Sequence, residues 1–156
     1  MTEELIFRPI FEFEWDEAMK VVWDTFVLFD APTYSREGIR NFKSFVRDPA
    51  LRDLYMEGKY PTFVALLNGM IVGVISIRNK NHISLLFVDR DFQRKGIASR
   101  LILKAVEHVK TKEDKNHITV FSSPHAIGFY HKCGFIDTSD EITTDGIRYT
   151  PMRLRL

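Results

Sequence analysis

The chain has 156 residues, which suits one compact domain over residues 1–156 and leaves little room for a second. Its 22 Lys and Arg residues nearly balance its 21 Asp and Glu residues, which argues against a fold built to coat nucleic acid. No apolar run reaches the roughly 18 residues that span a membrane, and acidic residues follow Met1 where a signal peptide would be basic, so we expect a soluble cytoplasmic protein.

The first third of the chain predicts one strand and two helices. Leu5 to Phe11 has the apolar pattern of a short strand, and from Glu14 to about Leu28 apolar residues recur at helical spacing. Ser35 is a suitable N-cap for a second helix that continues to about Arg47. The following Asp48-Pro49 pair is expected to end that helix.

Three strands are expected next. Thr62–Leu67 and Met70–Ile77 flank Asn68-Gly69, a strong signal for a tight hairpin. Ile83–Val88 is apolar almost throughout, as expected of a strand that is buried on both faces.

The clearest helix extends from about Lys95 to Lys110, with one apolar stripe and charged residues opposite. His117–Phe121 is a further short apolar strand. Ser123-Pro124 then predicts a helix start, with Ser as N-cap and Pro at the first helical position, and Gly134 predicts its left-handed C-cap.

The tail predicts strands at Phe135–Thr138 and Arg148–Leu154, with a second hairpin signal at Asp145-Gly146. The expected order of elements is β-α-α-β-β-β-α-β-α-β-β. This order indicates an α/β fold, with a mixed sheet that has a parallel crossover in the middle and about four helices around it.

The segment from His82 to Ser99 is the strongest candidate for a ligand site. The loop Asp89–Gly96 leads from a buried strand directly into the amphipathic helix, and a helix N-terminus favours an anion, a diphosphate most of all. Gly96 would let a phosphate approach the backbone. The pattern is neither a P-loop nor a dinucleotide fingerprint, and every crossover helix needs a turn before it, so a purely structural role stays open on these residues alone.

Two motifs resemble those of one enzyme superfamily. Gln93-Arg-Lys-Gly96-Ile-Ala98 resembles the [QR]-x-x-G-x-[GA] signature of the GNAT (GCN5-related N-acetyltransferase) superfamily. Ser122 to Phe135 resembles its second motif, in which A-x-x-F-Y-x-x-x-G-F is common. The spacing between the motifs and the order of elements around them match as well, so the chain is similar to a small single-domain member of that superfamily.

The resemblance implies a mostly antiparallel sheet whose central parallel pair is splayed to admit acetyl-coenzyme A (acetyl-CoA). Pantetheine would pair with exposed backbone like an added strand, the diphosphate would lie on N–H groups at the helix start, and a serine would stand where an asparagine often contacts the pantetheine arm. The coenzyme-binding residues implied in this way are Leu86, Phe87, Val88, Gln93, Arg94, Lys95, Gly96, Ile97, Ala98, Ser99 and Ser123.

The resemblance also implies an acid for the departing thiolate. Tyr130 matches the motif tyrosine, which in many members points its hydroxyl group at the coenzyme sulfur. The alternative is a tyrosine that packs on the inner face of its helix beside Ala126, Ile127 and Cys133.

A base must accept a proton from the amine, whose ordinary pKa lies near 10.4. His82 stands eleven residues before Gln93, where several members place a catalytic glutamate. Imidazole titrates near neutral pH and suits the role. The alternatives are a solvated histidine in the turn after Asn79 and a water chain that drains the proton.

The acceptor is expected between the first two helices, their connection and the last hairpin, around Phe29, Asp30, Tyr34 and Glu37. Asp30 or Glu37 could attract a cationic amine, although for each residue alone the sequence favours the alternative of a solvated loop carboxylate or a helix first-turn charge. His125 and His131 are interpreted as surface residues. His108 and His117 have no metal-ligand spacing with any partner, so we expect no metal.

Together these features predict an acetyl-CoA-dependent N-acetyltransferase that acts on a primary amine, of a small molecule or of a protein, by direct attack in a ternary complex. The alternative is a non-catalytic acyl-CoA-binding module that serves as a sensor or interaction domain. The family resemblance also allows a homodimer. Neither nucleic acid nor a membrane is expected as a partner, and the sequence does not identify the acceptor.

Overall fold

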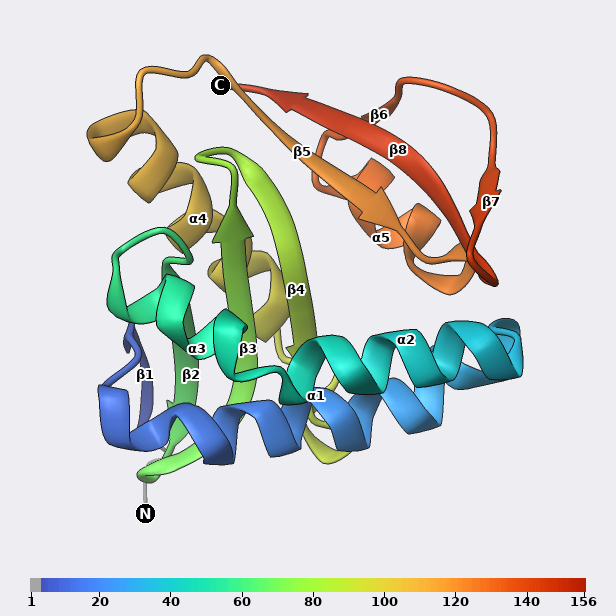
Figure 1. The fold of residues 1–156 in the computed structure, drawn as a ribbon. Helices are drawn as coiled ribbons and strands as arrows, with labels where there is room; N and C mark the ends of the chain where they lie inside the picture. The colour runs from blue at the N-terminus through green and yellow to red at the C-terminus, as the bar shows by residue number, and fades with distance from the viewer. Residues whose placement is uncertain (1–3) are drawn as a thin grey trace.

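The structure, a computed structural model, describes residues 4–156 as a single twisted sheet with helices on both faces (Figure 1). The strands are β1 (Leu5–Pro9), β2 (Thr62–Leu67), β3 (Met70–Arg78), β4 (His82–Val88), β5 (His117–Ser122), β6 (Ile136–Asp137), β7 (Ile142–Thr144) and β8 (Ile147–Arg155). The α-helices are α1 (Trp15–Phe29), α2 (Arg36–Arg47), α3 (Pro49–Met56), α4 (Ile97–Lys112) and α5 (Ile127–Lys132).

The strand order is β1-β2-β3-β4-β5-β8-β6, with β7 paired to β8. All neighbours are antiparallel except β4 and β5, which are parallel. The predicted fold class, a mixed and mostly antiparallel sheet with a central parallel pair, is therefore confirmed.

The parallel pair is short. The register of β4 and β5 consists only of His82 opposite Thr119 and Ile83 opposite Val120. Beyond these residues the two strands diverge, as Figure 1 shows. The predicted splay of the central pair is thus present, and it leaves the β5-facing edge of β4 without a strand partner from residue 84 onward.

Alternating side chains of the central strands build a core on each face of the sheet. On one face, Val74 of β3 packs in a cluster with Val22 of α1 and Val46 of α2. On the other, Ile75 packs in a cluster with Leu101 of α4, and α5 lies on this side as well. In Figure 1, α1 and α2 lie side by side in front of the sheet and α4 lies behind it.

One helix was not predicted. Asp48-Pro49 ends α2, as expected, but the Asp48 carboxylate also accepts a hydrogen bond from the Ala50 N–H at 2.9 Å and so caps α3. Residues 4–156 therefore form five α-helices, where about four were expected. The Ser35 cap of α2 is confirmed, since its hydroxyl accepts from the Gly38 N–H at 3.1 Å.

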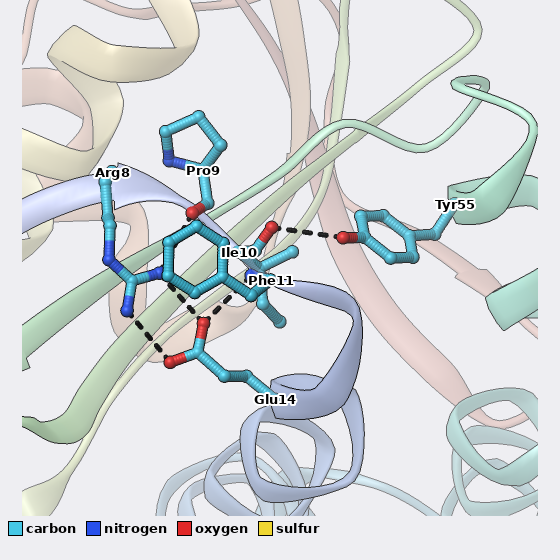
Figure 2. A network of polar contacts seen from close by, with 6 residues as sticks. All are labelled: Arg8, Pro9, Ile10, Phe11, Glu14 and Tyr55. Atoms are coloured by element: carbon cyan, nitrogen blue, oxygen red, sulfur yellow. Dashed lines mark hydrogen bonds and ion pairs between the residues drawn. The ribbon is translucent and has the colours of Figure 1, made fainter.

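An ion pair between the half-buried Arg8 and the buried Glu14 fixes the corner between β1 and α1 (Figure 2). Arg8 donates to both carboxylate oxygens of Glu14, at 2.8 and 2.9 Å, and the Phe11 N–H donates to one of them at 2.9 Å. These hydrogen bonds, that from Arg8 above all, hold the pKa of Glu14 below its usual range against the opposing effect of burial. Tyr55 of α3 adds a hydrogen bond to the Ile10 carbonyl at 3.0 Å. This corner sets the direction in which α1 crosses the sheet.

The last hairpin returns to the start of α2. Asp145 and Gly146 both have positive φ, at 52° and 79°, so the predicted turn is confirmed. The Ser35 N–H donates to the Gly146 carbonyl at 3.1 Å, and a Cβ on Gly38 would lie only 2.6 Å from that oxygen. The backbone of the β7–β8 hairpin is thus in direct contact with the backbone at the start of α2. Within residues 4–156, no helix has the length and apolar character needed to cross a membrane.

Candidate functional site

A cavity of about 910 Å³ opens where β4 and β5 diverge. Its floor comes from these two strands, and its walls come from α2, the α1–α2 connection, α5 and the β7–β8 hairpin. Of the residues singled out by sequence, the cavity is lined by His82, Leu86, Phe87, Val88, Gln93, Ala98, Ser123 and Tyr130, together with Phe29, Asp30 and Tyr34. The fold therefore brings both motifs and the expected acceptor region to one place.

The loop between β4 and α4 has the geometry of an anion site. Gly96 is the N-cap of α4, with φ 74° and no side chain to satisfy the first N–H groups of the helix. The first helical hydrogen bond is donated by the Arg100 N–H to the Gly96 carbonyl, so the N–H groups of Ile97, Ala98 and Ser99 have no acceptor within the helix. These N–H groups and the helix dipole suit a diphosphate.

Gln93 shapes this loop from within. Its side-chain amide donates to the Val88 carbonyl, so it fastens the loop back onto the end of β4. Gln93, the first residue of the predicted signature, therefore stabilises the loop and also lines the cavity. The remaining implied residues of the segment, Arg94, Lys95, Gly96 and Ser99, are exposed, whereas the Ile97 side chain is buried in the core and offers only its backbone N–H group.

Tyr130 is buried and lines the cavity. Its ring packs edge-on against Phe129 and Phe135, each at 5.3 Å between centroids, so Tyr130 is a core side chain that also borders the cavity, and its role as an acid stays a prediction. Burial, with a smaller effect from Asp30, raises the pKa of the Tyr130 hydroxyl well above its usual range. The hydroxyl group therefore stays protonated at neutral pH.

His82 is the first residue of β4 and is only 9 % exposed, so the alternative of a solvated histidine in a turn does not hold. Nδ1 lies 2.7 Å from the Thr119 hydroxyl oxygen, and the ring packs against Phe121 at 4.4 Å. Burial, with a smaller effect from the positive charge of Arg78, lowers the pKa of His82 to about 4. The imidazole is therefore neutral at pH 7 and a weak base.

An aspartate–histidine pair that was not predicted faces the same cavity. Nε2 of His125 lies 3.1 Å from Oδ1 of Asp30, and both residues line the cavity. The Asp30 carboxylate is buried rather than solvated, and burial raises its pKa to about 7, with a smaller lowering by a hydrogen bond from Ser123. Burial also lowers the pKa of His125. His125 is exposed, as expected of a surface residue, but its ring also contacts Asp30 and lines the cavity.

The acceptor region is otherwise close to expectation. Phe29 and Tyr34 line the cavity, as do residues of the last hairpin, but the Glu37 side chain is exposed and does not. Glu37 lies in the first turn of α2 and points elsewhere, which fits the helix-dipole alternative. His131 is exposed and pairs with Asp137 at 2.7 Å, as expected of a surface residue. In the described part of the chain, no group of three or more His, Cys, Asp or Glu side chains could hold a metal ion.

Sequence reasoning could not find the Asp30–His125 pair, because the two residues lie far apart in the chain and share no motif. The only signal was that His125 falls inside the second motif, two residues after Ser123.

Comparisons with known proteins agree with this geometry. A sequence model of the acetyltransferase (GNAT) domain family matches residues 30–156. Over 77 residues the chain is 34 % identical to an uncharacterized N-acetyltransferase, YafP, of Escherichia coli, which covers 49 % of this chain and 47 % of that protein. The chain spans about half the length of the curated relatives it matches.

Solved structures share the fold over the whole chain. A GCN5-related N-acetyltransferase from Rhodopseudomonas palustris superposes with a TM-score of 0.81 and 24 % identity, covering 100 % of this chain and 99 % of that one. A PaiA N-acetyltransferase from Thermoplasma acidophilum, solved in complex with coenzyme A, superposes with a TM-score of 0.77 and 18 % identity over 100 % of both chains.

Proposed function

Because the chain belongs to the GNAT acetyltransferase family, we propose that it transfers the acetyl group of acetyl-CoA to a primary amine by direct attack in a ternary complex. The observation that carries the proposal is the early end of the β4–β5 pairing, after Ile83 and Val120. It leaves backbone groups of β4 free to pair with pantetheine as an added strand would.

The residues of this chain fit the coenzyme. The unpaired edge of β4 from Leu86 to Val88 would hold the pantetheine arm, and the N–H groups from Ile97 to Ser99 would hold the diphosphate. Gly96 presents no side chain, and nothing lies within 4 Å of the place where a Cβ would stand, so the phosphates would have room beside the backbone. Ser123 lines the cavity and would contact the arm, with a shorter reach than asparagine.

The chemistry requires a stabilised oxyanion and a protonated leaving group. The amine nitrogen attacks the thioester carbonyl carbon, the C–S bond breaks, and the sulfur leaves as a thiolate. A β4 backbone N–H group near Phe87 or Val88 would stabilise the oxyanion. Tyr130 would donate its hydroxyl proton to the thiolate and regain one from solvent. Its raised pKa keeps that proton available at every physiological pH.

Two groups could accept the proton that the amine loses. His82 has a pKa of about 4, which makes it a weak base. The Asp30 carboxyl has a pKa of about 7 and contacts His125, whose ring is partly exposed to water. We favour the Asp30–His125 pair, since a base is most effective when its pKa lies near the working pH, and since His125 offers the proton a path to solvent.

The experiment is release of free coenzyme A thiol when the protein is incubated with acetyl-CoA and a panel of primary amines. Turnover with at least one amine, together with tight acetyl-CoA binding, supports the transferase. Tight coenzyme binding without turnover on any acceptor would favour a non-catalytic acyl-CoA-binding module, and absence of coenzyme binding would exclude both.

A further inference from the structure

One end of the cavity gathers hydrogen-bond donors around a single arginine. Arg78 ends β3 and stands opposite His82 in the β3–β4 register. Both side chains line the cavity, and so does that of Ser84, two residues further along β4. Among the described residues that line the cavity, Arg78 is the only lysine or arginine.

Within residues 4–156, the guanidinium group of Arg78 forms no ion pair with a carboxylate. Its Nε atom is buried and has no hydrogen-bond partner among residues 4–156. The two carboxylates that line the cavity, Asp30 and Asp145, form no ion pair with it; Asp30 contacts His125 instead. A charged group that is partly buried without a partner is costly to the fold. An anion from a ligand would offset that cost.

The neighbours of Arg78 are arranged to donate as well. Tyr60, fully buried, donates its hydroxyl hydrogen to the Ser84 hydroxyl oxygen at 2.8 Å, which leaves the hydrogen of Ser84 free to point into the cavity. On His82, Nδ1 lies 2.7 Å from the Thr119 hydroxyl oxygen. In the tautomer in which Nδ1 accepts the Thr119 hydroxyl hydrogen, Nε2 carries the ring hydrogen and can donate it to a ligand. Three polar side chains of this end can thus serve one anionic group, and none of them is a carboxylate.

The space between this end and the coenzyme is bordered by aromatic rings. They come from α2, the middle of β4, the end of β5 and β8: Phe42, Phe45, Phe87, Phe121 and Tyr149. The ring centroids of Phe121 and Tyr149 lie 4.6 Å apart, and those of Phe42 and Phe87 lie 5.9 Å apart. Such walls favour an apolar part of a ligand.

We propose that Arg78, Ser84 and His82 form a carboxylate subsite, and that the acceptor is an amino carboxylate with an apolar spacer between its two charged groups. The inference rests on the proposed transferase function for the place of the amine. The β4 backbone that would hold the thioester begins at Leu86, two residues beyond Ser84, or roughly 7 Å along a strand. The amine and the carboxylate of the acceptor are therefore separated by several methylene groups or their equivalent.

A matched pair of acceptors tests the subsite. 6-Aminohexanoate and hexylamine have the same length and differ in the carboxylate. We expect the wild-type protein to acetylate 6-aminohexanoate with a KM about tenfold or more below that for hexylamine, the usual weight of a charge-assisted hydrogen bond. Arg78→Gln should raise the KM for 6-aminohexanoate alone and so abolish the difference. Arg155→Gln, an exposed arginine at the end of β8, is the control and should keep it.

A binding measurement makes the result independent of turnover. The two acetylated products, N-acetyl-6-aminohexanoate and N-hexylacetamide, are titrated calorimetrically into the protein saturated with coenzyme A, whose binding by each variant also shows that the variant is folded. Selective binding of the carboxylate product that is lost in Arg78→Gln supports the subsite even if no amine is acetylated, in which case the transferase function alone fails. Equal affinity for the two products, no binding of either, or unchanged discrimination in Arg78→Gln would overturn it.

Discussion

Nε2 of His125 lies 3.1 Å from Oδ1 of Asp30, and this contact joins the connection after α1 to the turn after β5. The titratable groups that face Asp30 are His125, Tyr34 and Tyr130, and the two tyrosines stay neutral because burial raises the pKa of each. With a pKa of about 7, the Asp30 carboxyl gains its negative charge as the pH rises through neutrality. The pair is therefore suited to accept a proton only above that pH.

The first prediction concerns the pH dependence of acetyl transfer. The wild-type kcat/KM for the amine should rise with pH, with a limb centred near 7, because the deprotonated pair is the base. Asp30→Asn should lose this limb and lower the rate at pH 7.5 by about 10²-fold, a usual contribution of a general base. Asp145→Asn, an exposed carboxylate that borders the same cavity, should keep both. Persistence of the limb in Asp30→Asn would return the role to His82 or to water.

The second prediction concerns Tyr130. Tyr130→Phe removes only the hydroxyl group and keeps the ring that packs against Phe129 and Phe135. We expect kcat to fall by about 10²-fold while the Kd for acetyl-CoA stays nearly unchanged, as measured by steady-state kinetics and calorimetry. Tyr149→Phe removes a hydroxyl group from another wall of the same cavity and serves as the control. Equal kcat in Tyr130→Phe and the wild type would exclude the tyrosine as the acid.

The third prediction separates backbone strain from coenzyme binding. Gly96 and Gly69 both have positive φ, at 74° and 83°. At neither site would the Cβ of an alanine come within 4 Å of a neighbouring side chain or backbone segment. Replacement by alanine should thus cost each site a similar strain of about 1–2 kcal/mol. Only Gly96 lies where phosphates would approach the helix start, so Gly96→Ala should also raise the Kd for acetyl-CoA. A similar Kd in Gly96→Ala and Gly69→Ala would mean that the diphosphate does not use this backbone.

Local signals explain why much of the fold was predictable. Asn68-Gly69 and Asp145-Gly146 carry their turns within two residues, and the apolar stripe of α4 extends over four turns. The eight-residue helix α3 was missed because it is too short to show periodicity and because Asp48-Pro49 both ends one helix and begins the next.

The site was predictable only where a motif spans it. Gln93 to Ala98 and Tyr130 could be found because their neighbours in sequence are also their neighbours in space. The surroundings of Asp30 and Arg78 are set by tertiary structure: Asp30 contacts His125 from the turn after β5, and the Nε atom of Arg78 has no hydrogen-bond partner among the described residues. Burial raises the pKa of Asp30 and lowers that of His82, and so favours the neutral form of both groups. This burial also follows from packing that no local pattern encodes.

The last prediction concerns His82 and stability. The pKa of His82 is lowered in the folded state from 6.5 to about 4, so between these values the unfolded chain binds more protons than the folded one. Its contribution to the free energy of unfolding is therefore present above pH 6.5 and is lost as the pH falls toward 4. At about 1.4 kcal/mol per pKa unit, the loss amounts to about 2 kcal/mol at pH 5.

The His82→Gln variant tests this contribution, because its side chain cannot titrate and its amide can still form a hydrogen bond with Thr119. We expect the variant to be less stable than the wild type at pH 7.5 but to lose about 2 kcal/mol less on going to pH 5, as measured by urea unfolding at both pH values. If His82→Gln showed the same pH dependence as the wild type, folding would not shift the pKa of His82, and the assignment of His82 as a side chain that stays neutral down to pH 5 would have to be abandoned.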